Sequence, residues 1–273
     1  SRTRIQAAAN AGNILVNDAP VKPNYRVKPS DIIQIVLPNP PREIELIPQD
    51  IPINIVYEDD DVIVVNKKAG MVVHPAYGNY TGTLINALMF HFKDLPLFQS
   101  GDLRPGLVHR IDKNTSGLLV IAKNEYAMNR LARQFYNRTT GRRYLALVWG
   151  TPEPEEGTVT GNVGRNIRDR KIMQVFPDGS QGKHAVTHYT VIEKFSYVSL
   201  LECRLETGRT HQIRVHMSYI GHPLFNDGEY GGDRILKGTT FSKYQQFVRN
   251  CFEILPRQAL HAKSLAFDHP VTG

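Results

Sequence analysis

Cysteine is scarce in this sequence of 273 residues, and long apolar segments are missing. The two cysteines, Cys203 and Cys251, lie far apart and outside any CxxC pair. A structural zinc site needs about four ligands at short spacings, so we expect neither a zinc site nor a disulfide framework. This cysteine usage suits a reducing, cytoplasmic location. Because no apolar run approaches the ~20 residues that span a bilayer, we also expect no membrane segment.

Positive charge is what the sequence has in excess. Its formal net charge is +7 and its isoelectric point is about 9.4. Basic proteins of this kind tend to bind polyanions, because basic patches attract phosphate groups and release their counterions. Charge alone is equally compatible with an ordinary basic surface, so it indicates a nucleic-acid partner only together with other features.

The composition divides the chain near residue 45. Residues 1–37 contain a predicted short helix, Thr3–Ala11, which leads through Gly12 into Ile14–Asp18, and a predicted strand at Ile32–Leu37. A proline-rich stretch at 38–52 follows, which is typical of a semi-rigid linker. We therefore predict a small N-terminal α/β unit with its linker at 1–45 and a larger domain at 46–273. Fewer than 40 residues seldom form a stable core alone, so the small unit could instead be an arm packed on the larger domain.

The larger domain is predicted to be α+β. Strands follow strands without regular βαβ alternation, which favours a mixed, mostly antiparallel sheet flanked by helices and loops. The predicted strands are Ile53–Tyr57, Val62–Asn66, Gly117–Ala122, Tyr144–Val148, Ala185–Glu193, Ser199–Arg204 and Ala259–Phe267. The predicted helices are Thr83–Phe92, Tyr126–Asn137 and Thr210–Ile220.

The segment from His109 to Gly117 is rich in ionisable and hydroxyl groups and runs directly into an apolar strand. Loops of this type often carry functional groups on a rigid scaffold. Asp112 stands among cations, which favour its ionised form, so it could act as a nucleophile or a base. The alternative is structural: Asp112 or Asn114 could form an Asx turn with its own backbone.

A second segment, Glu206–Met217, begins with a glycine-bearing turn. Thr210 is predicted as the N-cap of a helix, and Arg214, four residues later, would project from the same face. The alternative for Arg214 is an ordinary solvent-facing arginine. His211 and His216 are five residues apart, a poor helical spacing for sharing a metal ion, and no third ligand is evident. We therefore predict no metal site.

These segments resemble a known family. His109-Arg110-Ile111-Asp112 with Thr115-Ser116-Gly117 is similar to the aspartate motif of the RluA/RluD-type pseudouridine synthases, with Ile111 where Leu is usual. Further matches follow in the family's order over residues 54–270, at Gly70–Pro75, Arg143–Val148, Gly208–His216, Gly221–Leu224, Asp227, Tyr230 and Leu260–Ala262. The N-terminal unit resembles the small RNA-binding module named after a small-subunit ribosomal protein, without that module's usual first helix.

The resemblance implies that uridine in RNA is isomerised to pseudouridine. Asp112 then corresponds to the catalytic aspartate, Arg214 to its basic partner, and Tyr144 to the active-site tyrosine that stacks on the base. Attack on C1′, attack on the ring and elimination to a glycal all remain open. No cofactor is implied, which agrees with the lack of a GxxxxGK[ST] loop and of a convincing GxGxxG segment.

The resemblance and the charge together predict the RNA contacts. Arg110 is expected to fill the space left by a flipped base. The other expected RNA-binding residues are His109, Arg142, Arg143, Arg165, Arg168, Lys171, Arg209 and His211. Each of the basic residues could alternatively belong to a solvated surface. The expected partner is large-subunit ribosomal RNA or a pre-ribosomal particle, bound by a monomer.

Two other classes of protein remain as alternatives. A non-catalytic RNA-binding or ribosome-assembly protein would have the same charge and the same N-terminal unit, but would not need Asp112, Tyr144 and Arg214 together. A glycosidase usually needs two carboxylates, and here the motif loop offers only Asp112; Glu206 could be the second, but the adjoining Thr-Gly-Arg pattern favours a positioning role.

Overall fold

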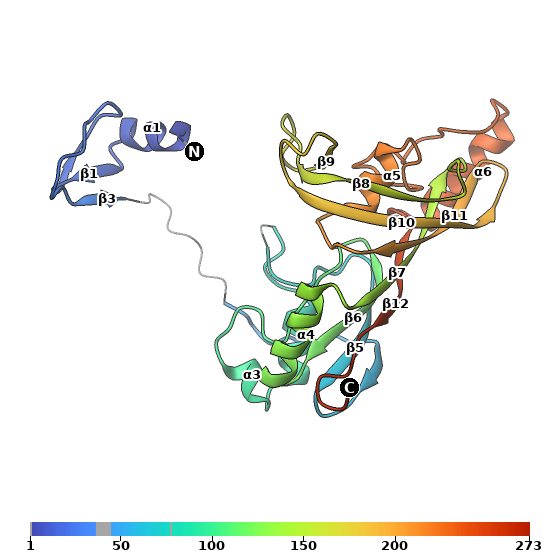
Figure 1. The fold of residues 1–273 in the computed structure, drawn as a ribbon, viewed down its shortest axis with the longest axis horizontal. Coiled ribbons are helices and arrows are strands. Elements are labelled where there is room, and N and C mark those ends of the chain that lie inside the picture. Colours follow the sequence, from blue (N-terminus) through green and yellow to red (C-terminus); the bar gives the residue numbers. More distant parts are fainter. Residues whose placement is uncertain (1, 37–44, 77) are drawn as a thin grey trace. The chain divides into compact units, whose positions relative to one another are not determined.

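The computed structural model describes residues 2–36, 45–76 and 78–273, and the chain divides into two compact units, Ser1–Glu45 and Leu46–Gly273. In the smaller unit, helix α1 (Arg2–Asn10) precedes a sheet with the strand order β2-β1-β3 (Figure 1). The strands are β1 (Ile14–Val16), β2 (Ala19–Pro20) and β3 (Ile33–Ile35). The left-handed residues Asn17 and Asp18 form the two-residue turn between β1 and β2 that such hairpins require.

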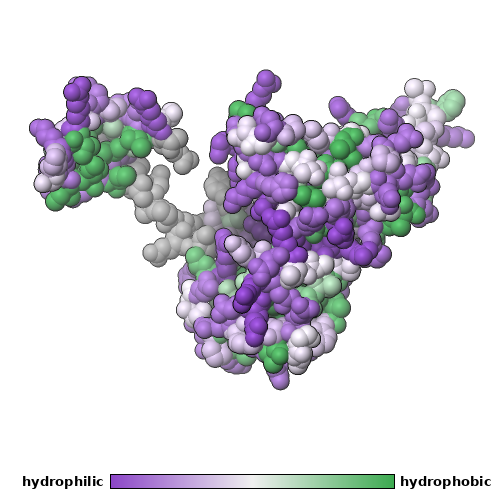
Figure 2. Space-filling view, in the orientation of Figure 1, coloured by the Kyte–Doolittle hydropathy of each residue, from purple (hydrophilic) through white to green (hydrophobic). Residues whose placement is uncertain are grey.

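The smaller unit exposes apolar side chains. Val27, Ile32, Ile33 and Ile35 are each at least half exposed, and hydrophobic residues gather on the visible face of this unit (Figure 2). Exposed apolar groups of this kind often mark an interaction surface. Residues 38–44 of the predicted linker and the last residue of the predicted strand 32–37 lie outside the described residues.

In the larger unit, the described strands form one sheet with the order β4-β5-β6-β12-β7-β11-β10-β8-β9. Every neighbouring pair is antiparallel except β12 and β6, which confirms the predicted α+β fold with a mixed, mostly antiparallel sheet. The strands are β4 (Ile55–Glu58), β5 (Val62–Lys67), β6 (Ser116–Ala122), β7 (Gly141–Trp149), β8 (Glu156–Arg165), β9 (Met173–Phe176), β10 (Lys183–Lys194), β11 (Val198–Leu205) and β12 (Leu260–Ala266). The helices are α2 (Leu84–His91), α3 (Pro96–Gln99), α4 (Glu125–Asn137), α5 (Gln212–Tyr219) and α6 (Ser242–Ile254).

Two of the helices begin at residues with clear capping signals, and one of them packs on buried strands. Thr83 caps α2 with a capping box to Asn86, and the Asn124 side chain accepts a hydrogen bond from the Ala127 N–H at the start of α4. The buried side chains of α4, Ala127 and Leu131, join a core cluster with β5 and β6. None of the helices in the described residues is both long and apolar enough to cross a membrane.

Strand β12 lies between β6 and β7 in the middle of the sheet (Figure 1). The contact with β6 is unusually close at Gly117, where a Cβ atom would lie 2.3 Å from the carbonyl oxygen of Ala262. Gly117 also has φ +116°, a conformation that other residues rarely adopt. This glycine therefore allows the loop that contains Asp112 to enter the sheet directly beside β12.

Candidate active site

Asp112 lies in a cleft of about 420 Å³ in the larger unit. The loop before β6, strand β7, the segment that leads into α5, and the end of α4 all contribute to its walls. Many of the side chains predicted from the sequence meet here: the cleft residues include His109, Arg110, Asp112, Arg142, Tyr144, Arg209, His211 and Arg214. Together with Leu260 of β12, residues on five separate segments of the chain thus form one site.

The Asp112 loop is held by its backbone rather than by the Asp112 carboxylate. The Thr115 N–H donates to the Asp112 carbonyl, and the Lys113 carbonyl accepts from the Gly70 N–H and from the Lys67 ammonium at 2.9 and 3.0 Å. Among the hydrogen bonds of the described residues, none closes an Asx turn at Asp112. The carboxylate, with a side chain that is 20% exposed, is therefore left to face the cleft.

Arg214 is buried, with 5% of its side chain exposed, and three carboxylates surround it. Its Nε and Nη2 donate to both oxygens of buried Asp227 at 2.7 Å, and Nη2 also donates to Glu229 at 2.6 Å. Its Nη1 lies 3.6 Å from Asp112 Oδ2. Burial alone would lower the pKa of Arg214, but the hydrogen bond to Asp227 and the three negative charges raise it above its usual value. The guanidinium is therefore a permanent positive charge beside Asp112.

Helix α5 begins differently from the prediction. The N-cap is His211, in the left-handed conformation with φ 56°, and Thr210 lies outside the helix, so the predicted Thr210 cap is wrong. The buried Gln212 side chain provides the contacts instead: its Oε1 accepts from the Arg209 N–H and the Thr207 hydroxyl. Left-handed backbone at a residue other than glycine costs about 1–3 kcal/mol and is concentrated at functional sites.

This backbone conformation places the His211 ring between Asp112 and Tyr230. The His211 Nδ1 lies 2.9 Å from the Tyr230 hydroxyl, which accepts from the Met173 N–H at 2.9 Å. The Tyr230 proton is thus available to Nδ1, and this favours the His211 tautomer that carries its proton on Nε2. Nε2 lies 4.0 Å from Asp112 Oδ1. Burial lowers the pKa of His211, so the ring is neutral near pH 7.

Tyr144 and Arg142 share one face of β7, because side chains two residues apart on a strand point the same way. Tyr144 is buried, and burial raises its pKa to about 12. Arg142 lines the cleft, whereas Arg143 points to the other face, where it forms an ion pair with Glu202. The two neighbouring arginines, both expected to bind RNA, therefore occupy different environments.

The remaining predicted RNA contacts are divided. The His109 Nε2 accepts from the Val120 N–H, and its ring stacks on Phe135 at 4.5 Å, so this side chain supports the cleft wall. Arg110 is exposed at the cleft. Arg165, Arg168 and Lys171 are exposed at the end of β8 and in the loop before β9, and they do not line this cleft.

Two cations near Asp112, the buried Lys67 and the half-buried Arg257, did not emerge from the sequence reasoning. Lys67 is 2% exposed, donates to the carbonyls of Lys68, Met71 and Lys113, and has its pKa lowered to about 8 by burial. Arg257 donates to the carbonyls of Asn114 and Leu260. Both cations hold backbone segments around the Asp112 loop. Lys67 ends an apolar strand beside Lys68, which makes it look like an ordinary surface lysine.

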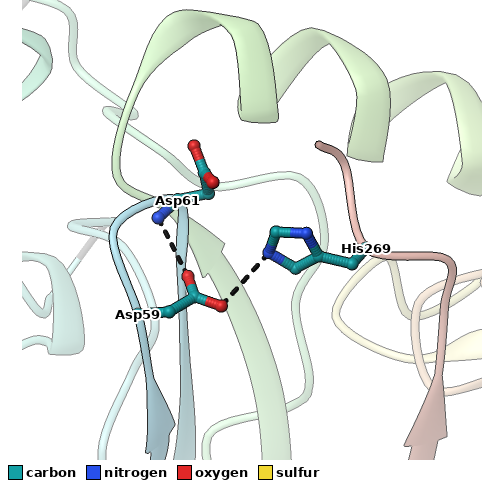
Figure 3. A group of neighbouring side chains, drawn as sticks. All are labelled: Asp59, Asp61 and His269. Atoms are coloured by element: carbon teal, nitrogen blue, oxygen red, sulfur yellow. Dashed lines mark hydrogen bonds and ion pairs between the residues drawn. The ribbon is translucent and has the colours of Figure 1, made fainter. Parts of the chain in front are cut away.

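Asp59, Asp61 and His269 form the one group in the described residues with suitable spacing for a metal ion (Figure 3). Hydrogen bonds already hold Asp59 and one nitrogen of His269 in place, although the buried His269 Nε2 itself has no hydrogen bond. Asp59 Oδ1 accepts from the N–H groups of Asp61 and Val62. The His269 Nδ1 accepts from the Thr272 N–H at 3.1 Å, so the ring proton is on Nε2, 3.1 Å from Asp59 Oδ2. A metal would need that same Nε2, so we interpret the group as an anchor for residues 268–272.

Two family models match parts of this chain. A family model described as RNA pseudouridylate synthase matches residues 61–219, more than half of the chain. The chain belongs to this family. A second model, described as S4 domain, matches residues 1–33. The pseudouridine synthase family and the N-terminal RNA-binding module expected from the motifs are thus both confirmed.

Relatives of this pseudouridine synthase extend over its whole length. An uncharacterized RNA pseudouridine synthase of Chlorobaculum parvum is 52% identical over 100% of this chain and 84% of its own. The ribosomal large subunit pseudouridine synthase D of Vibrio cholerae is 45% identical over 100% of this chain and 81% of its own. Among solved structures, human RNA pseudouridylate synthase domain containing 1 has a TM-score of 0.57 and 28% identity, covering 78% of each chain.

Proposed function

We propose that this enzyme isomerises uridines of large-subunit ribosomal RNA to pseudouridine, with Asp112 as the catalytic carboxylate. The observation that carries the assignment is the difference between Asp112 and the other carboxylates around Arg214. Asp227 and Glu229 hydrogen-bond to the guanidinium, whereas Asp112 lies 3.6 Å from it and faces the cleft. The RNA class follows from relatives at 45–46% identity named ribosomal large subunit pseudouridine synthase D.

The isomerisation needs few groups from the protein. The N1–C1′ bond breaks, the base turns, C5 bonds to C1′, and the C5 proton is lost as N1 gains one. Attack on C1′, attack on the ring and elimination to a glycal each need an ionised carboxylate at the nucleotide, and the Asp112 carboxylate lies 3.6 Å from the Arg214 guanidinium. Tyr144, with a pKa of about 12, enters the reaction protonated. We therefore assign it first to stacking on the base.

The two units divide the work in this proposal. Residues 1–45 contribute to RNA recognition, supported by the S4 match, and residues 46–273 perform the chemistry. A monomer suffices, because every residue of the cleft comes from one chain. A cytoplasmic location suits both the RNA substrate and the two free cysteines.

Tritium release from RNA labelled at C5 of uridine tests the proposal. The parent protein should release tritium from large-subunit ribosomal RNA, and Asp112→Ala should not, while still binding the RNA. Binding without release by the parent would favour a non-catalytic RNA-binding protein. Free uracil among the products would instead favour glycosidase chemistry.

A further inference from the structure

We propose that Arg138, Arg142 and Arg209 form a phosphodiester-binding subsite in the cleft, which holds the RNA backbone beside the uridine that enters the active site. This inference rests on the proposed function and assigns a distinct task to one part of the site. All three residues line the same cleft as Asp112. They reach it from the end of α4, from β7 and from the segment before α5.

Arg142 is the centre of this subsite because its guanidinium is desolvated and poorly paired. Its Nε atom is buried and has no hydrogen-bond partner. Its hydrogen bond from Nη2 to the Glu206 carbonyl is long, at 3.4 Å. A buried donor that lacks a partner costs about 1–3 kcal/mol, and more when it is charged. The protein therefore keeps an incompletely bonded cation in the cleft.

The charges around Arg142 point to an anion. Burial lowers the pKa of Arg142, and the neighbouring positive charge of Arg138 lowers it further. The same two causes, in the same order, lower the pKa of Arg209. Within the described part of the chain, no carboxylate forms a salt bridge with any of these three arginines, and the cleft carboxylate Glu206 bonds to His188 at 2.5 Å. An entering phosphate would relieve this repulsion.

The surroundings fit a strand of nucleic acid. The Phe135 ring lies 5.8 Å from the Arg142 guanidinium carbon, and Tyr136 next to it is 86% exposed at the cleft. Gly208 leaves room for the guanidinium, because a Cβ atom there would lie 2.6 Å from Arg142 Nη1. A planar cation that can bind a phosphate in a bidentate manner, beside an exposed aromatic ring, is the combination that binds single-stranded RNA.

The chain provides a matched control one residue away. Arg143 belongs to the same strand but lines a different surface hollow with Glu202 and Arg204, and Glu202 is its ion-pair partner. The two substitutions Arg142→Met and Arg143→Met remove the same charge from the same strand. They differ in the face of the sheet that they change, and the subsite is on the Arg142 face.

The experiment measures the affinity of the full chain for a stem-loop of large-subunit ribosomal RNA as a function of salt. Arg142→Met should weaken binding about 10–100-fold near 0.1 M salt and reduce the slope of log K against log salt by about one. Arg142→Lys should restore part of the slope, and Arg143→Met, which changes the other face of the sheet, should lose much less affinity than Arg142→Met. At saturating RNA, the turnover of Arg142→Met should fall less than its affinity.

Neutral methylphosphonate linkages, introduced one at a time around the target uridine, identify the phosphate. At one linkage the parent should lose affinity while Arg142→Met is insensitive, because the partner charge is already gone. Additive losses at every linkage, or equal losses in Arg143→Met, would overturn the subsite. The two proposals can fail separately. If the parent releases tritium but Arg142→Met stays sensitive to every linkage, only the subsite is rejected. If Arg142→Met is insensitive to one linkage but the parent releases no tritium, only the isomerase assignment is rejected.

Discussion

Arg214 and Arg142 line the same cleft and differ in almost every partner. Arg214 is bonded to Asp227 and Glu229 and lies beside Asp112, and these charges raise its pKa. Arg142 has a long hydrogen bond to a carbonyl, and burial lowers its pKa. The protein itself completes the surroundings of the first arginine, whereas a ligand must complete those of the second. One end of the cleft is thus organised for chemistry and the other for binding.

The largest effect should come from Asp112, whose charge faces the cleft beside Arg214. Asp112→Asn keeps the shape of the side chain and removes its charge. We expect turnover to fall by about 10⁴-fold or more, which is the size of the loss when an enzyme loses its nucleophile. Single-turnover tritium release at saturating RNA measures this, and RNA affinity should stay within a few-fold of the parent. Retained turnover would place the catalytic carboxylate elsewhere.

The stability of the fold should also be sensitive to the loss of one ion-pair partner of Arg214. Asp227→Ala leaves the buried Arg214 without its bidentate acceptor, so we expect the free energy of unfolding to fall by about 3–5 kcal/mol. Urea unfolding followed by circular dichroism measures the change. Asp233→Ala, at an exposed position nearby, provides the control and should change stability by less than about 0.5 kcal/mol. Equal stability of both variants would contradict the picture of Arg214 as a buried, charge-dependent centre.

Acid should lower the stability of the fold through His109, which lines the cleft near Arg142. Burial, with the Arg142 charge adding to it, lowers the pKa of His109 to about 3. Between the unfolded pKa of ~6.5 and this value, the unfolded chain binds a proton that the folded chain does not, so stability present above pH ~6.5 is lost as pH falls. From pH 7 to 5 the parent should lose about 2 kcal/mol more than His109→Gln. Parallel losses in urea unfolding would show that His109 titrates normally.

The smallest effect should be on the stability of Arg142→Met. Removal of an incompletely paired, half-buried cation should leave the free energy of unfolding unchanged or raise it by about 1 kcal/mol. Arg214→Met, the same substitution at the arginine that is paired with carboxylates, should lower the free energy of unfolding by about 3–5 kcal/mol. Thermal and urea unfolding of the two variants side by side test the contrast. A similar loss in both would mean that Arg142 is structural.

Much of the fold could be predicted from sequence because the core strands carry clear signals. The predicted strands at Val62–Asn66 and Gly117–Ala122 correspond to β5 and β6, which are apolar and buried. Strand β8 was missed because Gly157, Gly161 and Gly164 usually weaken a strand prediction. In the fold these glycines allow close packing: a Cβ atom on Gly161 would lie 2.7 Å from Val175. Helix α6 was missed because it has no side-chain cap and no acidic first turn.

The site was partly predictable for a related reason. The motifs brought Asp112, Tyr144 and Arg214 to one cleft, but the sequence could not show which neighbours of Arg214 are carboxylates, since Asp227 and Glu229 come from a later loop. Nor could it separate Arg142 from Arg143 until the strand register was known. The start of α5 was misplaced because Thr210 is a good capping residue, and only the tertiary contacts of Gln212 override that preference.

The central place of β12 has a consequence for when the enzyme becomes active. The ribosome makes β12 after every other strand described, yet β12 is the strand that joins β6, which follows Asp112, to β7, which carries Tyr144. Without β12, this strand order would leave two separate sheets, with Asp112 beside one and Tyr144 on the other. A chain that lacks β12 is therefore expected to be inactive, even though it contains Asp112, Tyr144 and Arg214.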